Sequence, residues 1–354
     1  MKYSVVDISS SGLSAIVAEV LDGEEKIIYR ERVSLSLMHY FEGGRLSARG
    51  TDKLIDALSQ MKNNCKNMGA ERLYLISTAA LRNVKNYEEI REAILSSTGI
   101  PLNPIDGKTE AYCDHIANSD IAPEGSVLAD IGSKSIEICD MSDNDKGNMI
   151  SLDFGLIDLQ KKFVKSIQPT EEEAKKIKKF TKRRLERADV PGEGKFSSAV
   201  LVGSTSLAVY DMFADHSKTD ESGSEKRIQY KKFKKFAKHM LSDISRSKLI
   251  LENAPEKLYI IGPAVIVIRC LFKHFGVDDI IVSDRGVKEG YLKLMTSGSE
   301  NGEYLDFTEH SHASVKAAIP GNPNAKVHNS KKSITAGSAK TSHPRKNPAA
   351  EKED

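Results

Sequence analysis

Cysteine is scarce in this sequence, with four residues among 354, at positions 65, 113, 139 and 270. No two of them have the C-x-x-C spacing of a zinc ribbon or a redox motif. A chain of this length does not need disulfide bonds to stay folded. We therefore expect four structural thiols in a reducing compartment, with Cys113 as a packed thiol.

Long apolar runs are also absent. The most apolar window, Tyr259–Ile268, has ten residues, about half of the roughly 20 that a membrane-spanning helix needs. The N-terminal sequence MKYSVVDISSSG contains a short apolar run that ends at Asp7, whereas a secretory signal has a longer run without an acidic residue. These features predict a cytoplasmic protein with no membrane partner.

The chain has no large excess of charge of either sign, because 52 Lys and Arg residues face 50 Asp and Glu residues, a formal net charge of +2. This balance argues against nucleic acid as a partner. An apolar fraction of 39% and a charged fraction of 29% are typical of a globular chain. The length favours two domains followed by a tail.

The C-terminal segment differs in composition from the rest. From about Gly298 onward polar residues, Gly and Pro dominate, and residues 310–354 contain eight Lys and Arg against three acidic residues. Such a segment cannot bury enough apolar surface to offset the entropy of ordering, so we predict a disordered basic tail at 298–354. A solubilising extension is the favoured interpretation, and a tether for anionic partners is the alternative.

Residues 1–296 have the texture of an α/β fold. Short runs rich in β-branched residues alternate with helical stretches, which is typical of sheets covered by helices. The predicted helices include 52–67, 87–98 and 170–188, and the predicted strands include 73–77, 127–131, 199–202 and 258–261. Two strongly basic stretches, 175–187 and 227–238, have apolar residues at helical spacing, which favours solvated helix faces over a surface that steers polyanions.

One internal similarity indicates a duplicated unit. SVVDISSSGLSAIVAEV at 4–20 and SVLADIGSKSIEICDM at 126–141 each contain an apolar strand, an Asp-Ile pair, a turn of small residues and a second strand. A repeated half-domain is the simplest account. It places one β-hairpin in each domain, with the two hairpins facing each other across a cleft.

An aspartate stands before each turn, Asp7 in the first hairpin and Asp130 in the second. This pattern suits phosphate chemistry, because turn amides cradle phosphoryl oxygens while carboxylates hold hydrated Mg²⁺ or the attacking water. The turns are poor in the glycine that lets backbone approach a ligand closely. Taken alone, the motif therefore also fits an ordinary hairpin.

Seven segments together resemble one known family. The first hairpin is followed by ISTAALRNVKN (76–86), GKTEA (107–111), LADIGSKSIEI (128–138), SLDFGLIDLQKKF (151–163), VGSTSLA (202–208) and VSDRGVKEGYL (282–292). In this order they resemble the motifs of the exopolyphosphatase and guanosine-pentaphosphate phosphohydrolase family, within the superfamily of actin, sugar kinases and heat-shock chaperone ATPases. The resemblance extends from about residue 3 to residue 295.

The resemblance implies an α/β fold of two actin-like (ribonuclease H-like) domains with an interdomain cleft. The first domain would comprise residues 1–124, completed by a helix near 284–296, and the second would comprise residues 125–283. The resemblance also implies the site. Glu110 would orient the attacking water and Arg82 would neutralise phosphoryl oxygens, while Asp7, Asp130 and Glu137 would organise Mg²⁺. The phosphate-binding loops would be formed by Ser9, Ser10, Ser11, Gly12, Gly132, Ser133, Lys134 and Ser135.

Several loop glycines of the family are replaced in this sequence. Ser9 stands in the first loop, Ser133 and Lys134 stand in the second, and a paired glycine of a later segment reads Gly203-Ser204. Each added Cβ costs about 1 kcal/mol if the turn needs a positive φ. Lys134 would either place its ammonium on the phosphate chain or pair with Asp130 and Glu110 and close the site, and the sequence leaves both open.

Two functions follow as alternatives. The favoured one is a Mg²⁺-dependent hydrolase that releases terminal phosphate from inorganic polyphosphate or a guanosine pentaphosphate-like nucleotide, because the groups that perform the chemistry are present. The alternative is a weakened or inactive relative that binds such a ligand as a sensor or scaffold, which the altered loops favour. An ATPase or sugar kinase fits the segments less well. Only the predicted tail follows residue 295 at the place where larger family members carry a long C-terminal domain, so we expect a firm grip on long chains to require a homodimer or the charge of the tail.

Overall fold

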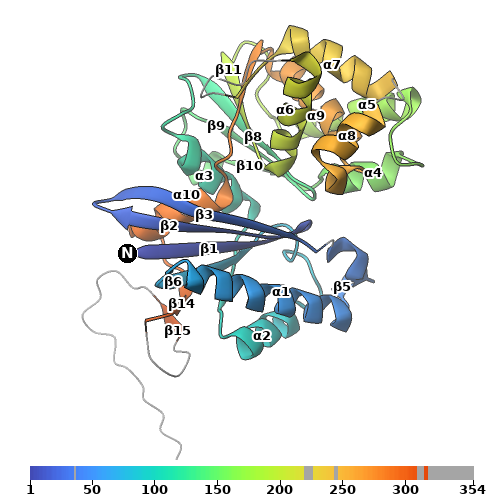
Figure 1. Ribbon diagram of the computed structural model, residues 1–354. Helices are drawn as coiled ribbons and strands as arrows, with labels where there is room; N and C mark the ends of the chain where they lie inside the picture. Colours follow the sequence, from blue (N-terminus) through green and yellow to red (C-terminus); the bar gives the residue numbers. More distant parts are fainter. Residues whose placement is uncertain (36, 219–225, 243–245, 309–314, 318–354) are drawn as a thin grey trace, which may run out of the picture. The chain divides into compact units, whose positions relative to one another are not determined.

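The computed structural model describes residues 1–35, 37–218, 226–242, 246–308 and 315–317 (Figure 1). These residues belong to one structural unit, which spans residues 1–318. The unit contains two large β-sheets with helices packed on them, so the predicted α/β class is confirmed. Most of the predicted tail, 298–354, lies outside the described residues. In the described ranges, no helix has both the length and the apolar character needed to cross a membrane.

The first sheet has the strand order β15-β14-β6-β1-β2-β3, with β7 paired to β6. β1 is antiparallel to β2 and parallel to β6. Successive side chains of a strand point to opposite faces, so Val5 and Val6 of β1 enter two different hydrophobic clusters. The strands are β1 (Lys2–Ser9), β2 (Gly12–Leu21), β3 (Glu24–Ser34), β6 (Arg72–Ser77), β7 (Leu102–Pro104), β14 (Glu303–Asp306) and β15 (Val315–Ala317).

Helices cover both faces of this sheet. The cluster of Val6 includes Leu54 of α1 and Ile90 of α2, and the cluster of Val5 includes Leu292 of α10 and a cysteine of α3. The helices are α1 (Ala48–Asn67), α2 (Tyr87–Thr98), α3 (Gly107–Asn118) and α10 (Val287–Thr296). A small hairpin of β4 (Phe41–Glu42) and β5 (Arg45–Leu46) follows a 3-10 helix at Leu37–Tyr40.

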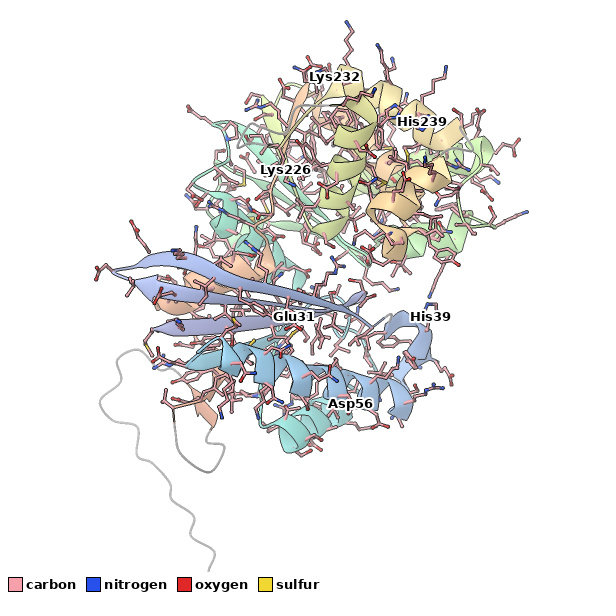
Figure 2. All side chains as sticks on the ribbon, viewed as in Figure 1. Glu31, His39, Asp56, Lys226, Lys232 and His239 are labelled. Carbon is pink, nitrogen blue, oxygen red and sulfur yellow. The ribbon has the colours of Figure 1, made fainter. Side chains whose placement is uncertain are left out.

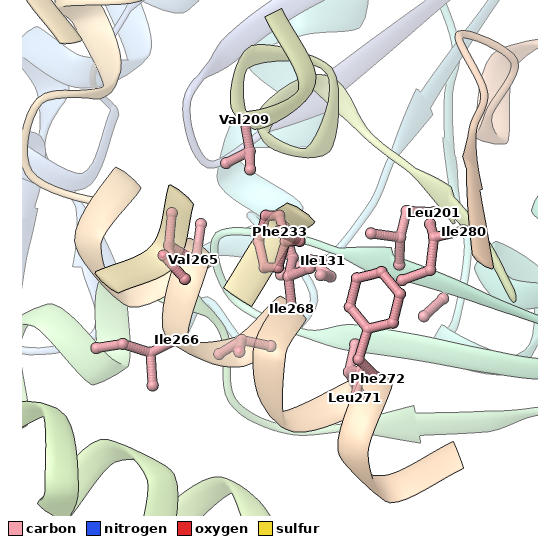
Figure 3. Close-up of a cluster of buried hydrophobic side chains, with 14 of the residues drawn as sticks. Ile131, Leu201, Val209, Phe233, Val265, Ile266, Ile268, Leu271, Phe272 and Ile280 are labelled. Carbon is pink, nitrogen blue, oxygen red and sulfur yellow. The ribbon is translucent and has the colours of Figure 1, made fainter. Parts of the chain in front are cut away.

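The second sheet has the strand order β10-β9-β8-β11-β13-β12. Its larger cluster joins Leu201 of β11 and Ile280 of β13 to Ile268 and Phe272 of α9 (Figure 3). The strands are β8 (Ser126–Ile131), β9 (Ile136–Asp140), β10 (Ile150–Leu152), β11 (Ser198–Val202), β12 (Arg227–Gln229) and β13 (Asp279–Val282). The helices are α4 (Leu156–Phe163), α5 (Glu171–Arg187), α6 (Ser204–Ser217), α7 (Tyr230–Ser242), α8 (Arg246–Asn253) and α9 (Ile261–Phe275), with 3-10 helices at Lys146–Asn148 and Pro255–Lys257.

The two sheets share one arrangement around their first hairpins. β8 is antiparallel to β9 and parallel to β11, as β1 is antiparallel to β2 and parallel to β6. A further antiparallel strand extends each hairpin, β3 beside β2 and β10 beside β9. This shared arrangement confirms the predicted internal repeat.

Helix α3 packs against both sheets. Cys113 lies in the cluster of Val5 on the first sheet, whereas Ala111 lies with Leu128 and Val200 of the second sheet. Glu110 stands directly before Ala111, in the first turn of α3. Its position is therefore fixed by the packing of both sheets on one helix.

Solvated helices form over most of the two basic stretches, as the favoured interpretation predicted, except that Arg227–Gln229 form strand β12. Ile177 and Leu185 of α5 and Phe233 and Phe236 of α7 are buried. Between these apolar positions stand exposed lysines, and Lys232 projects from α7 (Figure 2). The apolar residues of both stretches thus anchor the helices while the charges stay in water.

Two segments differ from the sequence predictions. The strand predicted at 258–261 is wrong, because Ile261 is the first residue of α9, a helix with most of its residues buried. A short apolar run does not distinguish a buried strand from a buried helix. The disorder predicted from Gly298 is wrong over Glu303–Asp306, which form β14 beside β6, and over Val315–Ala317, which form β15 beside β14. Tyr304 and Leu305 are only 5% and 6% exposed, so the burial of these two apolar side chains holds β14 on the sheet.

Helices α3 and α10 cross closely at Gly290. A Cβ at this position would lie 1.8 Å from the carbonyl oxygen of Cys113, so a larger residue requires movement of the backbone. Cys113 is fully buried, as predicted for a packed thiol, and all four cysteines are free.

We predict that Gly290→Ala lowers the free energy of unfolding by about 2 kcal/mol, because the added methyl group overpacks the helix crossing. Equilibrium denaturation measures the change. Gly192→Ala is the matched control, since its Cβ would approach no atom more closely than 3.3 Å. Equal stability of the two variants would contradict the close crossing.

Candidate active site

The turn of the first hairpin is held by its own serines. Ser9 is paired with Gly12 across the turn, and the Ser9 hydroxyl donates to the Gly12 carbonyl at 3.1 Å and lies 3.1 Å from the Ser11 hydroxyl. Gly12 has a φ of 150°, and a Cβ there would lie 2.0 Å from the Val33 carbonyl oxygen. Glycine is therefore required at this one position of the turn, while serine is accommodated at the others.

The turn of the second hairpin packs against the start of α4. The amides of Leu156 and Ile157 donate to the carbonyls of Gly132 and Ser133 at 3.1 and 3.0 Å. Lys134 reaches the same helix, because its ammonium donates to Oδ1 of Asp158 at 2.8 Å. Lys134 thus does not pair with Asp130 and Glu110, one of the two contacts that the sequence left open, and its ion pair with Asp158 holds the turn to α4.

The replaced loop glycines carry no backbone strain. Within the described ranges, the non-glycine residues with positive φ are Asp22, Asp189 and Lys218, which lie outside the hairpin turns. Gly203, by contrast, has a φ of 92°, and a Cβ there would lie 2.3 Å from Oδ1 of Asp130. Glycine is therefore required at position 203, where α6 begins close to the side chain of Asp130.

Three acidic side chains meet beside the second hairpin. Glu110, Asp130 and Glu137 each place a carboxylate oxygen within 4.8 Å of the other two. Asp130 and Glu137 face each other across β8 and β9. Glu110 comes from the first turn of α3, whose N-cap Asp106 accepts from the amide of Thr109 at 2.7 Å.

Two neighbours partly offset or orient these charges. Arg82 donates from Nη2 to Oε2 of Glu110 at 2.5 Å, so two residues predicted for the site form a partly buried ion pair. Ser151 donates from its hydroxyl to Oε1 of Glu137 at 2.8 Å. The predicted catalytic residues and one serine that the sequence analysis did not identify are thus in direct contact around the acidic group.

Burial makes ionisation of these acids costly. It raises the pKa of Asp7 and Asp130 to about 6 and that of Glu137 to about 8, and it raises the pKa of Glu110 well above its ordinary range. Repulsion between the carboxylates adds to the effect for Glu110, Asp130 and Glu137, whereas Lys288 lowers the pKa of Asp7 and Asp130. The cluster is therefore short of positive charge.

The donor set fits a hard divalent cation. Oδ1 of Asp7 and Oδ1 of Asp130 are buried and accept no hydrogen bond from the part of the chain that the structure describes. Carboxylate oxygens are the protein ligands that Mg²⁺ prefers. The closest triple contains Glu110, whereas the sequence placed Asp7 with Asp130 and Glu137.

A cavity of about 400 Å³ adjoins the acidic group. Its lining combines residues of both hairpins with cations that the sequence analysis did not identify. From the predicted site it includes Asp7, Ser9, Ser11, Glu110, Asp130 and Gly132, and its cations are Arg30, Arg32, Arg285 and Lys288. The spacing of Arg30 and Arg32 was a sequence signal for this cationic wall, because residues two apart on a strand point to the same face.

The remaining predicted residues do not line this cavity. Arg82, Lys134 and Ser135 line a second cavity of about 440 Å³. Ser10, Gly12, Ser133 and Glu137 line neither of these two cavities. The structure therefore brings the acids and the first turn together, while the side chains of the second turn face a separate opening.

Comparison with known proteins identifies relatives along most of the chain. The sequence profile of the Ppx/GppA phosphatase family matches residues 16–297. Exopolyphosphatase 1 of Mycobacterium tuberculosis is 20% identical over 342 residues, which cover 91% of this chain and 96% of that protein. The crystal structure of the Aquifex aeolicus member of the Ppx/GppA family has 25% identity and a TM-score of 0.71, covering 85% of this chain and 99% of that one.

A further crystal structure has the same fold. The exopolyphosphatase from Cytophaga hutchinsonii gives a TM-score of 0.72 at 18% identity, covering 84% of this chain and 98% of that one. These similarities confirm the resemblance seen in the sequence and the predicted fold of two actin-like domains.

We predict that Glu137→Gln stabilises the metal-free protein at pH 8 and has no such effect near pH 4. Below its ordinary value of 4.5, Glu137 is protonated in both the folded and the unfolded chain. As the pH rises toward its folded value of about 8, the unfolded chain loses the proton first, so the carboxyl costs stability. Glutamine keeps the shape and the acceptor for Ser151 without the charge.

Thermal unfolding in the presence of a chelator, at both pH values, measures this difference. Glu92→Gln, an exposed acid of α2, is the control. A Glu137→Gln protein that melts at or below the temperature of the wild type at pH 8 would contradict the prediction.

Proposed function

Because the chain belongs to the Ppx/GppA phosphatase family, we propose that it is a Mg²⁺-dependent hydrolase that releases the terminal phosphate of inorganic polyphosphate or of a guanosine pentaphosphate-like nucleotide. The observation that carries the proposal is the close group of Glu110, Asp130 and Glu137, two of which line a cavity together with four cations. Buried acids with raised pKa values beside a cavity are typical of catalytic sites.

Glu110 is assigned as the base that orients the attacking water. It is 7% exposed, and it lies at the cavity wall. Its raised pKa makes it a better proton acceptor at neutral pH, provided that nearby cations keep it ionised. Arg82 is the cation in contact with it, and the same guanidinium is suited to neutralise phosphoryl oxygens.

Mg²⁺ is assigned to Asp130 and Glu137 of the second hairpin, with Asp7 on the first. The two unpartnered oxygens of Asp7 and Asp130 support this assignment. When bound, the ion would neutralise charge on the phosphoryl oxygens and so assist the attack on phosphorus. Without the ion, Lys288 is the cation that most lowers the pKa of both aspartates.

The substrate is an extended phosphate compound. The cavity is lined by cations on β3 and at the start of α10 and by the hydroxyls of Ser9 and Ser11, a donor set that suits several phosphoryl groups in a row. The named exopolyphosphatases among the relatives support inorganic polyphosphate. The family description, which includes both branches, supports the nucleotide equally.

The alternative is a sensor or scaffold that binds polyphosphate or a nucleotide without turnover. Lys134 favours it, because the ion pair with Asp158 ties the second turn to α4. The first turn favours it too, because its serine hydroxyls bond within the turn. Either contact reduces the donors left for a phosphoryl group.

Four further sequence predictions belong to this proposal. A cytoplasmic location accords with four free thiols. A homodimer and the lack of a nucleic-acid partner rest on the sequence arguments alone. A tether role for the tail concerns residues outside the described ranges.

We predict that the wild-type protein releases phosphate only with Mg²⁺ and that Glu110→Gln reduces the rate by about 10²- to 10⁴-fold, the usual contribution of a positioned base. Phosphate release is measured from long-chain polyphosphate and from guanosine pentaphosphate in parallel. Glu92→Gln serves as the control for removal of an acid elsewhere.

The outcomes separate the alternatives. Release from one substrate alone identifies that substrate. A folded wild-type protein that binds either compound but releases no phosphate is the sensor, and a Glu110→Gln variant with the wild-type rate shows that another group orients the water.

A further inference from the structure

A second large cavity, here called the hairpin cavity, lies beside the cavity of the candidate active site. It has a volume of about 790 Å³ and is lined by the β2–β3 hairpin around its turn, by the end of α3 and by α10. Arg30, Arg285 and Glu289 line both cavities. Because these side chains form a shared wall, a ligand that is bound beside Glu110 and extends past Arg30 enters the hairpin cavity.

Both cavities lie along one face of the β2–β3 hairpin. Residues directly opposite each other on paired strands point to the same face. The pair of Ile16 and Arg30 lines the active-site cavity, and the pair of Val20 and Glu25 lines the hairpin cavity. Ile16 and Val20 are four positions apart on β2, so the two pairs share a face. Leu292 of α10 packs in the same cluster as Ile16 (Figure 1), so the two cavities follow one another between the hairpin and α10.

The cations of the hairpin cavity are already neutralised. Arg30 forms an ion pair with Glu289. Arg285 donates to both carboxylate oxygens of Asp120, at 2.8 and 2.7 Å, and the ammonium of Lys293 lies 3.8 Å from the same carboxylate. Each of the three cations in the lining thus has an acidic partner within the lining. A further row of phosphoryl groups would find no unpaired positive charge there.

Two acids of the lining, Glu24 and Glu25, form no ion pair with the residues that the structure describes. Glu25 is half-buried, and the hydroxyl of Thr296 donates to its Oε1 at 2.8 Å, which fixes the position of the carboxylate. Burial raises the pKa of Glu25, so its charge is costly unless a ligand supplies hydrogen-bond donors. The hairpin cavity therefore repels a phosphate chain and favours a ligand with N–H groups.

We propose that the hairpin cavity binds the guanine base of a nucleotide whose phosphates occupy the active-site cavity, with Glu25 accepting hydrogen bonds from N1 and the 2-amino group. The proposal rests on the function proposed above and deepens it, because it assigns a nucleotide and not long-chain polyphosphate as the substrate class. Two adjacent N–H groups on one edge of guanine match the two oxygens of a carboxylate. The planar guanidinium groups of Arg30 and Arg285 suit stacking on a base, and Val20 and Ile27 add apolar contact.

The test is calorimetric titration without Mg²⁺, so that no turnover is needed. The probes are guanosine 5′-triphosphate, inosine 5′-triphosphate, which lacks the 2-amino group, and tripolyphosphate, which lacks the nucleoside. The two nucleotides carry the same phosphates, so a difference between them reports on the base alone. We expect the wild type to bind guanosine 5′-triphosphate about tenfold more tightly than inosine 5′-triphosphate, the effect of one hydrogen bond to a charged group.

Two variants of Glu25 separate recognition of the base from recognition of the phosphates. Glu25→Gln keeps the shape of the side chain and an acceptor for Thr296 while it removes the charge. We expect it to weaken binding of guanosine 5′-triphosphate about tenfold and to leave the affinity for tripolyphosphate unchanged. Glu25→Lys should also strengthen binding of long-chain polyphosphate, because a repelling acid becomes a cation. Glu92→Gln, at an exposed acid of α2, is the control.

Three results would overturn the base subsite. The first is equal affinity of the wild type for the two nucleotides, or no binding of either. The second is a Glu25→Gln protein that melts normally and keeps the wild-type affinity for guanosine 5′-triphosphate. The third is an equal loss of tripolyphosphate binding in that variant, since Glu25 would then act on the phosphates. A wild type that prefers guanosine 5′-triphosphate but releases no phosphate from guanosine pentaphosphate with Mg²⁺ instead defeats the hydrolase and leaves the subsite standing.

Discussion

Repulsion among buried carboxylates is the constraint to which the rest of the site responds. Glu110, Asp130 and Glu137 lie within 4.8 Å of one another in a place where ionisation is costly. A chain free to relax would separate them. They stay together because two of them face each other across a hairpin and the third stands on a helix that packs against both sheets.

The close packing that holds the carboxylates together leaves some backbone positions with no room for a side chain. At Gly203 a Cβ would meet Asp130, and at Gly290 a Cβ would meet the backbone of α3. Turn positions without such neighbours accept serine and lysine, and their φ values are ordinary. In this chain, glycine is thus needed where neighbouring atoms come close or where φ is positive. The number of glycines in a loop does not by itself show whether the loop keeps its conformation.

The sequence identified the parts of the site that are encoded locally. The repeated hairpin, Glu110 at the start of a helix and Arg82 after a strand were all apparent from short segments in register. The partner of Lys134 was not apparent, because Asp158 is 24 residues away and belongs to another helix. Arg32 was not apparent for the same reason, because its hydrogen bond to Ser11 joins β3 to a turn 21 residues earlier in the chain. The strand predicted at 258–261 was wrong because a short apolar run looks the same in the sequence of a buried strand and of a buried helix.

The pairing of β14 with β6 determines where the folded part of the chain can be cut. β14 pairs with Leu73 and Arg72 of β6, and the Glu303 backbone exchanges two hydrogen bonds with the Asn103 side chain at 2.8 Å each. A version ended near Gly298, where the composition changes, would leave the start of β6, at Arg72 and Leu73, without its neighbour on the β14 side, and open edges recruit strands from other molecules. Proteolytic trimming or expression of a shortened chain should therefore preserve the residues through Ala317 to keep the product monodisperse.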